Sequence, residues 1–470
     1  MIPLECEAIC KTTISTDLAA KQAEGKEAKS WSELIPPLYH QHAKVFSKEE
    51  AKQLPPHCKW DHAIVLTADA PKTLKCKTYP LTLKEQDAID EIINEQLEKE
   101  YIWPLDSPYA LQIFFVSKKD GSFCPVQDYR VLNKYTIPNR YPLPNLEDLT
   151  RRLANAQLFT ALDLQAGYNN IRIKEGDQWK AAFKTPATRT CPPGHWEPNV
   201  MPFGLSSAPA TFQEFINEVL KDLIATGLVL VYLDDILIAT PHDLPLHRKI
   251  VNQVLAKMAE YDLYLKPKKC VFEQRTITYL GLVIGEGAIH MDPLKVEAVC
   301  TWPPPQNPHE LHVFLGLIGW LWPFLEGFSH KSHPLNHLTK KGVEFNWTPE
   351  CQTAFEALKS LATSYPTLAQ PDLDKPFEVE VDASNFTTGA ALMQRDNWNK
   401  ACPVAYRSQT LNQAKRGYNV YDKELLVVLH ALQHWRHYLV DAKHQVIVHT
   451  DHEALLGFKE PKNINWRLAQ

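Results

Sequence analysis

The chain has 470 residues, of which 44% are hydrophobic and 22% charged, and its formal net charge is −5. This length exceeds what one hydrophobic core usually supports and suggests about three domains. The composition indicates a globular protein without a membrane span or secretory signal, and the net charge disfavours a protein that coats nucleic acid in bulk.

The N-terminal half combines a polar lead-in with short helices and strands. Residues 1–57 are weakly patterned and predict a linker with one helical piece near 31–46. The elements predicted after it are, in order, a helix over 82–101, a strand over 111–117, a hairpin turn at 118–121, a strand over 158–162, and a helix capped by Ser207 that runs to Leu223.

Residues 229–238 are two apolar, β-branched runs separated by Asp234-Asp235, which predicts a hairpin with both carboxylates at its turn. Adjacent carboxylates repel each other unless a cation lies between them. Because Mg²⁺ takes hard oxygen ligands and bridges phosphates, the pair predicts a metal site for phosphoryl transfer, with an acidic surface turn as the alternative. Asp163 ends an earlier strand, and antiparallel pairing would bring three acids together for two-metal chemistry.

The pattern of hydrophobic and polar residues changes after Trp302. The predicted elements are an apolar and aromatic segment over 311–324, a helix over 351–361, a linker over 366–375, a strand over 377–382, a helix over 421–439 and a strand over 446–448. The last block places Asp382 and Asp451 at strand ends and Glu424 on the helix. Three acids from different elements again suit two metal ions and an activated water, although each acid alone is typical of a protein surface.

The ordered blocks of this sequence resemble those of reverse transcriptases from gypsy-type LTR retrotransposon polyproteins. These blocks lie at 115–121, 127–134, 139–144, 162–164, 201–205, 232–235, 266–270 and 279–281. Three later blocks resemble the ribonuclease H domain that follows the polymerase in this family, at 381–384, 423–426 and 449–452. The resemblance covers residues 40–467 in the family's order.

The resemblance implies an α+β fold. It consists of a right-hand polymerase with fingers, palm and thumb, followed by a C-terminally incomplete ribonuclease H-like α/β domain. The expected divisions are a lead-in over 1–57, fingers and palm over 58–288, thumb and connection over 289–368, and the ribonuclease H-like domain over 369–470.

Site residues carry over by position in the sequence. The resemblance implies metal binding by Asp163, Asp234 and Asp235 in the polymerase and by Asp382, Glu424 and Asp451 in the ribonuclease H-like domain. It also implies a triphosphate contact by Lys118, a sugar contact by Tyr168 that excludes a 2′-OH, a nucleotide pocket lined by Phe203 and Gly204, proton donation by Lys269, and a primer grip at Leu280 and Gly281. A core tyrosine and a solvated lysine are the ordinary alternatives for Tyr168 and Lys269.

The implied activity is RNA-directed DNA synthesis, in which dNTPs are added to a primer 3′-OH with Mg²⁺, or Mn²⁺ in its place. Its partners would be an RNA template, a DNA primer or RNA–DNA hybrid, and dNTPs, with no membrane. The scattered cysteines favour reduced thiols, so a retroelement particle in the cytoplasm or nucleus is expected. The alternatives are a decayed or co-opted product that binds nucleic acid without catalysis, and a hydrolase acting only through its C-terminal acids.

Four features depart from the family pattern. Cys124 stands where an arginine that would pair with triphosphate is usual, and residues 185–194 lengthen a hairpin connection. Trp322-Pro323 replaces paired arginines, and its proline is expected to break a helix. The sequence stops before the fourth ribonuclease H acid, as in a piece of a longer polyprotein. These features spare the polymerase triad and argue against nuclease activity.

Overall fold

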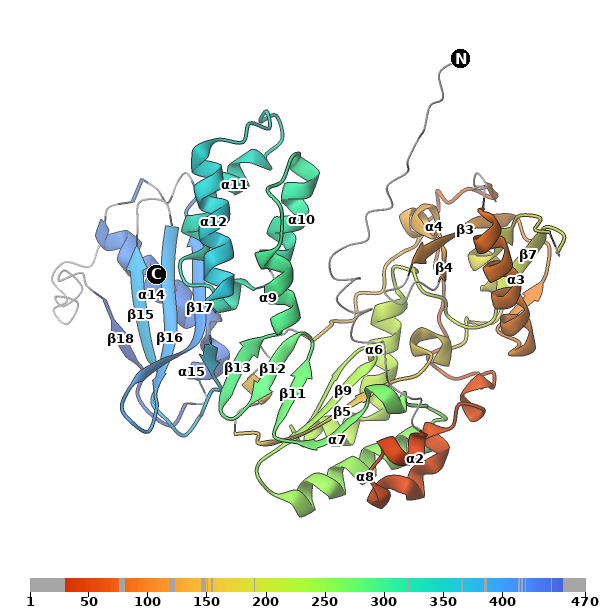
Figure 1. Ribbon diagram of the computed structural model, residues 1–470, viewed down its shortest axis with the longest axis horizontal. Coiled ribbons are helices and arrows are strands. Elements are labelled where there is room, and N and C mark those ends of the chain that lie inside the picture. The colour runs from red at the N-terminus through yellow and green to blue at the C-terminus, as the bar shows by residue number, and fades with distance from the viewer. Residues whose placement is uncertain are drawn as a thin grey trace. The chain divides into compact units, whose positions relative to one another are not determined.

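The computed structural model describes most of the chain between residues 30 and 450. The described ranges are 30–75, 81–117, 123–144, 149, 151–153, 155–189, 191–319, 321–364, 367–383, 387–412, 415, 417–418, 420–440 and 442–450. The chain divides into two compact units, one of Met1–Asn145 with Leu158–Gln274 and one of Leu146–Gln157 with Arg275–Gln470 (Figure 1). The finer domain divisions expected from the resemblance stay a prediction.

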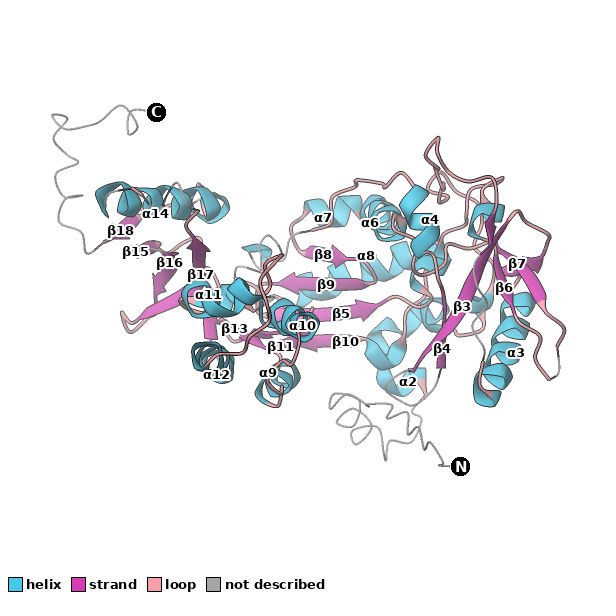
Figure 2. Cartoon of the chain, turned by 90° about the horizontal axis from the view of Figure 1, so that it is seen from above, coloured by secondary structure: helices cyan, strands magenta, loops and turns pink. Residues whose placement is uncertain are grey.

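A four-stranded sheet forms the centre of the first unit. Its strand order is β10 (Val271–Gln274), β5 (Leu158–Asp163), β9 (Asp235–Thr240) and β8 (Val229–Tyr232), and every neighbouring pair is antiparallel (Figure 2). The side chains of β5, β8 and β9 are mostly buried, as their apolar, β-branched runs predict. The helices that follow these strands or precede them are α6 (Ala208–Val219), α7 (Lys221–Ala225) and α8 (Leu244–Glu260).

A second sheet of the first unit has six strands. Its order is β1 (Leu74–Lys75), β3 (Tyr109–Ser117), β6 (Phe183–Thr185), β7 (Gly194–Pro198) and β2 (Ile102–Pro104), with β4 (Phe123–Gln127) paired to β3. Helix α3 (Leu83–Glu98) begins with a capping box in which Thr82 and Glu85 bond each other's backbone N–H groups. Its buried residues are Ile89 and Ile93, so the helix predicted over 82–101 is confirmed.

The segment expected to be a lead-in packs into the first unit. It contains α2 (Trp31–Leu34) and the 3-10 helices η1 (Pro37–Phe46) and η2 (Glu50–Lys52), and Tyr39, Val45 and Phe46 are buried in the core. The Tyr39 ring lies 5.1 Å from that of Phe272 on β10. The helical piece predicted near 31–46 is confirmed as α2 and η1, but the expectation of a linker is wrong for residues 30–52, because this segment packs into the core.

The remaining short elements of the first unit connect these parts. They are α4 (Arg130–Tyr135), η3 (Gly167–Asn170), η4 (Gln178–Ala181) and η5 (Pro267–Lys269).

Ser207 occupies the N-cap position of α6, but its side chain makes no capping bond. Its hydroxyl instead accepts the Asn139 backbone N–H at 3.0 Å, so the predicted capping bond is wrong.

The second unit begins with an antiparallel sheet and helices. The strands are β11 (Thr276–Tyr279), β12 (Leu282–Gly285), β13 (Ala288–Met291) and β14 (Thr367–Ala369), and the helices are α9 (Pro293–Cys300), α10 (Pro308–Gly319), η6 (Trp322–Phe324), α11 (Phe328–Leu338) and α12 (Pro349–Thr363). Part of the predicted linker over 366–375 is thus a strand, because 367–369 pair with β13. Helix α10 ends before Trp322-Pro323, which opens a 3-10 helix, as the proline predicts.

The second unit ends in a mixed sheet. Its order is β17 (Ala401–Thr410), β16 (Thr387–Arg395), β15 (Glu378–Ala383) and β18 (Ile447–His449), with β15 and β18 parallel. The helix predicted over 421–439 is two helices, α14 (Val420–His434) and α15 (Arg436–Leu439), separated at the buried Trp435. Within the described ranges, no helix has the length and apolarity needed to cross a bilayer.

Candidate active site

The hairpin between β8 and β9 presents Asp234 at its turn. Tyr232 pairs with Asp235, so Leu233 and Asp234 are the two turn residues and Asp235 begins β9. The hairpin is confirmed, but the prediction that both carboxylates form its turn is wrong for Asp235. Leu233 has a φ of +52°, where a glycine or asparagine is usual. Its backbone N–H donates to the side-chain oxygen of buried Gln213 at 2.8 Å. This bond from α6 holds a turn that its own residue types disfavour.

Three carboxylates come together at the ends of β5 and β9. Asp163 is the last residue of β5 and lies directly opposite Asp235 in the antiparallel register. The N–H of Leu164 donates to the backbone oxygen of Asp234 at 3.0 Å. Directly opposed residues hold their Cβ atoms within about 5.5 Å. The antiparallel pairing expected for these strands is confirmed, and it concentrates three acids at one sheet edge.

Burial makes this edge electrostatically unfavourable for anions. Burial, together with the charges of Asp163 and Asp235, raises the pKa of Asp234 to about 6, against the pull of Lys266 and Lys269. Burial and Asp163 also raise the pKa of Asp235. The Oδ1 atom of Asp234 is buried without a hydrogen-bond partner. An unpaired buried carboxylate oxygen is costly, and a cation would remove that cost.

These residues supply the donors that a hard divalent cation requires. All three are carboxylates, and Asp234 Oδ1 is free to coordinate. In the part of the chain that the structure describes, no three His, Cys, Asp or Glu side chains are already arranged to hold a metal. At the triad, both oxygens of Asp163 bind ammonium groups, from Lys266 at 2.8 Å and Lys269 at 3.0 Å. The three carboxylates are suitable ligands for a metal ion. The two ion pairs, however, occupy the Asp163 oxygens that such an ion would need.

Two aromatic side chains predicted to face a nucleotide lie next to each other. Tyr168, on η3, has its ring 5.0 Å from that of exposed Phe203 and 5.6 Å from that of buried Phe212. Burial and the nearby Asp234 raise the pKa of Tyr168 to about 12, so its hydroxyl stays protonated. The predicted pocket residues are therefore adjacent to one another, and Tyr168 is close to the triad.

The Gly204 turn is held by a residue that the sequence reasoning missed. Asn133, on α4, donates to the Gly204 backbone oxygen and accepts the Ser206 N–H, both at 2.9 Å. Gly204 has a φ of +99°, which favours glycine. Gln213 and Gly167 were missed as well. An amide inside an apolar helix stripe was the available signal for Gln213, because buried amides usually hold backbone groups.

The other predicted polymerase residues belong to the second unit or lie outside the residues that the structure describes. Lys118 lies outside the described residues, as does the side chain of Cys124. Leu280 and Gly281 form the tight turn between β11 and β12 in the second unit, with φ of +50° and +78°. The φ of Gly281 favours glycine, whereas a Cβ at this position would meet only the flexible end of the Lys295 side chain.

The ribonuclease H acids are described in part. Asp382 is exposed on β15, and Glu424 is buried on α14, where its carboxylate accepts the Thr450 hydroxyl at 3.5 Å. Asp451 lies outside the described residues. Because β15 and β18 are parallel, their carboxyl ends share one sheet edge. Asp382 and Thr450 therefore lie toward the same edge.

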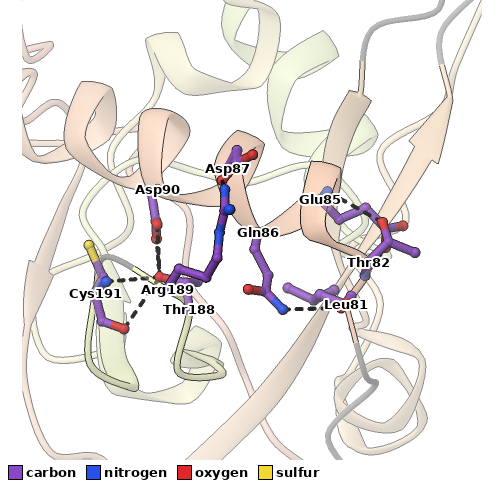
Figure 3. Close-up of polar contacts among 9 residues, drawn as sticks. All are labelled: Leu81, Thr82, Glu85, Gln86, Asp87, Asp90, Thr188, Arg189 and Cys191. Atoms are coloured by element: carbon purple, nitrogen blue, oxygen red, sulfur yellow. Dashed lines mark hydrogen bonds and ion pairs between the residues drawn. The ribbon is translucent and has the colours of Figure 1, made fainter.

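The long connection between β6 and β7 is bound to α3 (Figure 3). The Thr188 hydroxyl donates to the Asp90 carboxylate at 2.7 and 3.0 Å, and Arg189 pairs with Asp87 at 2.5 Å. Thr188 and Cys191 also exchange hydrogen bonds across the loop. The additional residues thus close a small turn of their own and pack against the helix.

The raised pKa of Asp234 predicts that Asp234→Asn stabilises the metal-free fold. The folded state binds more protons than the unfolded state between the ordinary pKa of 3.8 and about 6, so the wild type loses stability as pH rises through that window. Asparagine cannot ionise, and we expect a gain of up to about 2–3 kcal/mol at pH 7.5 that shrinks toward pH 4. Urea unfolding with EDTA measures it; equal stabilities at pH 7.5 would contradict the prediction.

Two family comparisons cover the regions just described. Residues 116–284 match the family described as reverse transcriptase (RNA-dependent DNA polymerase). Residues 347–448 match the RNase H-like domain found in reverse transcriptase.

Relatives are found among curated proteins and solved structures. The Tf2-3 and Tf2-7 transposon polyproteins of Schizosaccharomyces pombe are 36% and 35% identical over 438 residues, which is 93% of this chain. The chain spans 32% of the length of each. Foamy viral protease-reverse transcriptase dRH in complex with dsDNA is 22% identical to this chain and superimposes with a TM-score of 0.76 over 95% of this chain and 76% of that one. The complex with RNA/DNA hybrid gives 0.72 at 21% identity, over 97% and 60%. These likenesses confirm the expected α+β fold.

Proposed function

From the premise that this chain carries the reverse transcriptase and ribonuclease H-like domains of a retrotransposon polyprotein, we propose that it extends a DNA primer on an RNA template. The single observation that carries the proposal is the cross-strand pairing of Asp163 with Asp235, beside the unpartnered buried oxygen of Asp234. Such an arrangement serves phosphoryl transfer, where positioning and charge neutralisation do most of the work.

Each residue of the site has a defined task in this proposal. A divalent cation, Mg²⁺ or Mn²⁺, held by Asp163, Asp234 and Asp235 would neutralise charge on the reacting phosphate oxygens. Tyr168 and Phe203 provide an aromatic surface for the incoming sugar and base, and Asn133 fixes the Gly204 turn beside them. Lys269, whose ammonium lies 3.0 Å from Asp163, supplies the proton for the leaving pyrophosphate.

Tyr168 is expected to select deoxynucleotides. Replacing it with alanine removes the ring that would meet a 2′-OH, so Tyr168→Ala should raise ribonucleotide use relative to dNTP use by on the order of a hundredfold, or about 3 kcal/mol. Tyr168→Phe keeps the ring and its contacts with Phe203 and should keep the discrimination. The measurement is the ratio of kcat/KM for matched nucleotides, and an unchanged ratio in Tyr168→Ala would refute the assignment.

The proposed partners are dNTPs, an RNA template and a DNA primer or RNA–DNA hybrid. The solved relatives were captured with dsDNA and with RNA/DNA hybrid, which supports nucleic acid as the partner here. A basic groove can bind nucleic acid despite the net charge of −5, because binding depends on local charge. We place the protein in a retroelement particle of the cytoplasm or nucleus.

A second activity is proposed for the C-terminal domain. Asp382, Glu424 and Asp451 would hold divalent cations and direct water at the RNA strand of a hybrid. The shared edge of parallel β15 and β18 and the buried carboxylate of Glu424 support this.

One assay tests both activities. An oligo-dT primer is annealed to an end-labelled RNA template, and the protein is supplied with dNTPs and Mg²⁺ or with EDTA. Primer extension that requires the metal supports the polymerase, and shortening of the RNA without dNTPs supports the nuclease. Salt-dependent binding with neither product, from protein shown to be folded, would favour the non-catalytic alternative.

A further inference from the structure

The turn over residues 266–269, which contains η5, lies beside the end of β5. Backbone hydrogen bonds connect this turn to Asp163. The Lys266 N–H donates to the Asp163 backbone oxygen at 2.9 Å, and Leu265 forms a bridge with Leu164. The Lys269 N–H then donates to the Lys266 oxygen, which closes η5. The position of Lys266 beside Asp163 is therefore set by main-chain bonds and does not depend on the charge of its side chain.

The ammonium groups of Lys266 and Lys269 each bind a different oxygen of the Asp163 carboxylate. Lys266 Nζ lies 2.8 Å from Oδ1 and Lys269 Nζ lies 3.0 Å from Oδ2. The Lys266 side chain is 40% exposed and that of Lys269 is 61% exposed, whereas Asp163 is 16% exposed. Lys266 is thus the more enclosed of the two cations, and the oxygen it occupies belongs to the acid that pairs with Asp235.

We propose that Lys266 is a resident counter-cation of the triad, which holds the carboxylates together without metal and leaves Asp163 when a divalent cation binds. The proposal deepens the polymerase function and rests on it. A carboxylate that binds an ammonium group and a metal at once would bring two cations into close contact, and their repulsion disfavours that state. Lys266 is a positioning residue here, because it acts on the metal site through Asp163.

The measurable consequence is a metal affinity limited by Lys266. Replacing the Lys266 ammonium with an uncharged chain of similar length removes the group that competes with a metal ion for Asp163. It also removes a positive charge that would repel that ion. Lys266→Met should therefore bind Mn²⁺ more tightly, on the order of fivefold, since a half-exposed pair contributes modestly in water. The methionine keeps the backbone bonds to Asp163 and much of the alkyl packing.

The test is an Mn²⁺ titration of the full chain by electron paramagnetic resonance, without nucleic acid or nucleotides. Lys268→Met is the matched control, because Lys268 lies on the same turn, is exposed and has no acidic partner among the described residues. The site at the triad is identified as the part of the binding that Asp234→Asn removes, which separates it from binding by the C-terminal domain. Circular dichroism and urea unfolding establish that each variant is folded, and Lys266→Gln repeats the change with another uncharged chain.

The outcomes separate this inference from the polymerase proposal. Tighter binding in Lys266→Met and Lys266→Gln, with Lys268→Met like the wild type, supports the inference. Equal affinity in wild type and both Lys266 variants overturns it while leaving the polymerase proposal intact. Binding that Asp234→Asn does not alter in any background overturns both, because the triad then holds no metal.

Discussion

Asp234→Asn is expected to reduce primer extension on the order of a thousandfold while leaving template–primer affinity within about twofold of the wild type. The carboxylate is the acid of the triad with a buried, unpartnered oxygen, and the amide that replaces it carries no charge. The hairpin does not depend on that side chain, because Gln213 holds the turn through the Leu233 backbone. The variant should therefore fold and bind nucleic acid.

The measurement is single-turnover incorporation of one dNTP with saturating Mg²⁺, beside a filter-binding titration of the same template–primer. Asp222→Asn is the matched control, since Asp222 is an exposed acid on α7 outside the site. It should incorporate like the wild type. If Asp234→Asn incorporated at the rate of Asp222→Asn, the metal assignment of the triad would be wrong.

The strands that carry the polymerase acids could be predicted because their local and global signals agree. β5, β8 and β9 are short apolar runs buried as continuous strands, β8 and β9 are also rich in β-branched residues, and each acid stands at or next to a strand end. Helix α3 was predicted from its apolar stripe, and the structure adds a Thr82–Glu85 capping box at its start, whose two bonds are local. Antiparallel pairing was expected to bring Asp163 to the acids of the hairpin, and the register that sets it opposite Asp235 comes from the structure.

The parts that escaped prediction depend on contacts between distant segments. Tyr39 becomes a core residue only because Phe272 of β10 lies against it. Residues 367–369 become a strand only because β13 offers an edge. The Ser207 hydroxyl accepts the Asn139 backbone N–H and does not form the expected capping bond. The Lys266 ion pair likewise joins two residues that are 103 positions apart in the sequence.

Gly167→Ala is the substitution outside the triad from which we expect the largest loss of synthesis. Gly167 has a φ of +48°, and a Cβ there would lie 2.9 Å from Asp234 Oδ2 and 3.1 Å from Oδ1. Contacts this short force the carboxylate, or the η3 turn that carries Tyr168, to move. A displacement of about 1 Å at reacting groups reduces rates on the order of a hundredfold.

The backbone cost of alanine at positive φ must be separated from this collision, and the chain contains a residue that does so. Gly176 has a φ of +85° with nothing within 4 Å of its would-be Cβ, so Gly176→Ala pays the backbone strain alone, about 1 kcal/mol. We expect both variants to lose stability in urea unfolding, Gly167→Ala at least as much as Gly176→Ala, but only Gly167→Ala to lose single-turnover incorporation. Equal incorporation by the two would mean that Asp234 tolerates the methyl group, and that the close approach of Gly167 does not set the position of the carboxylate.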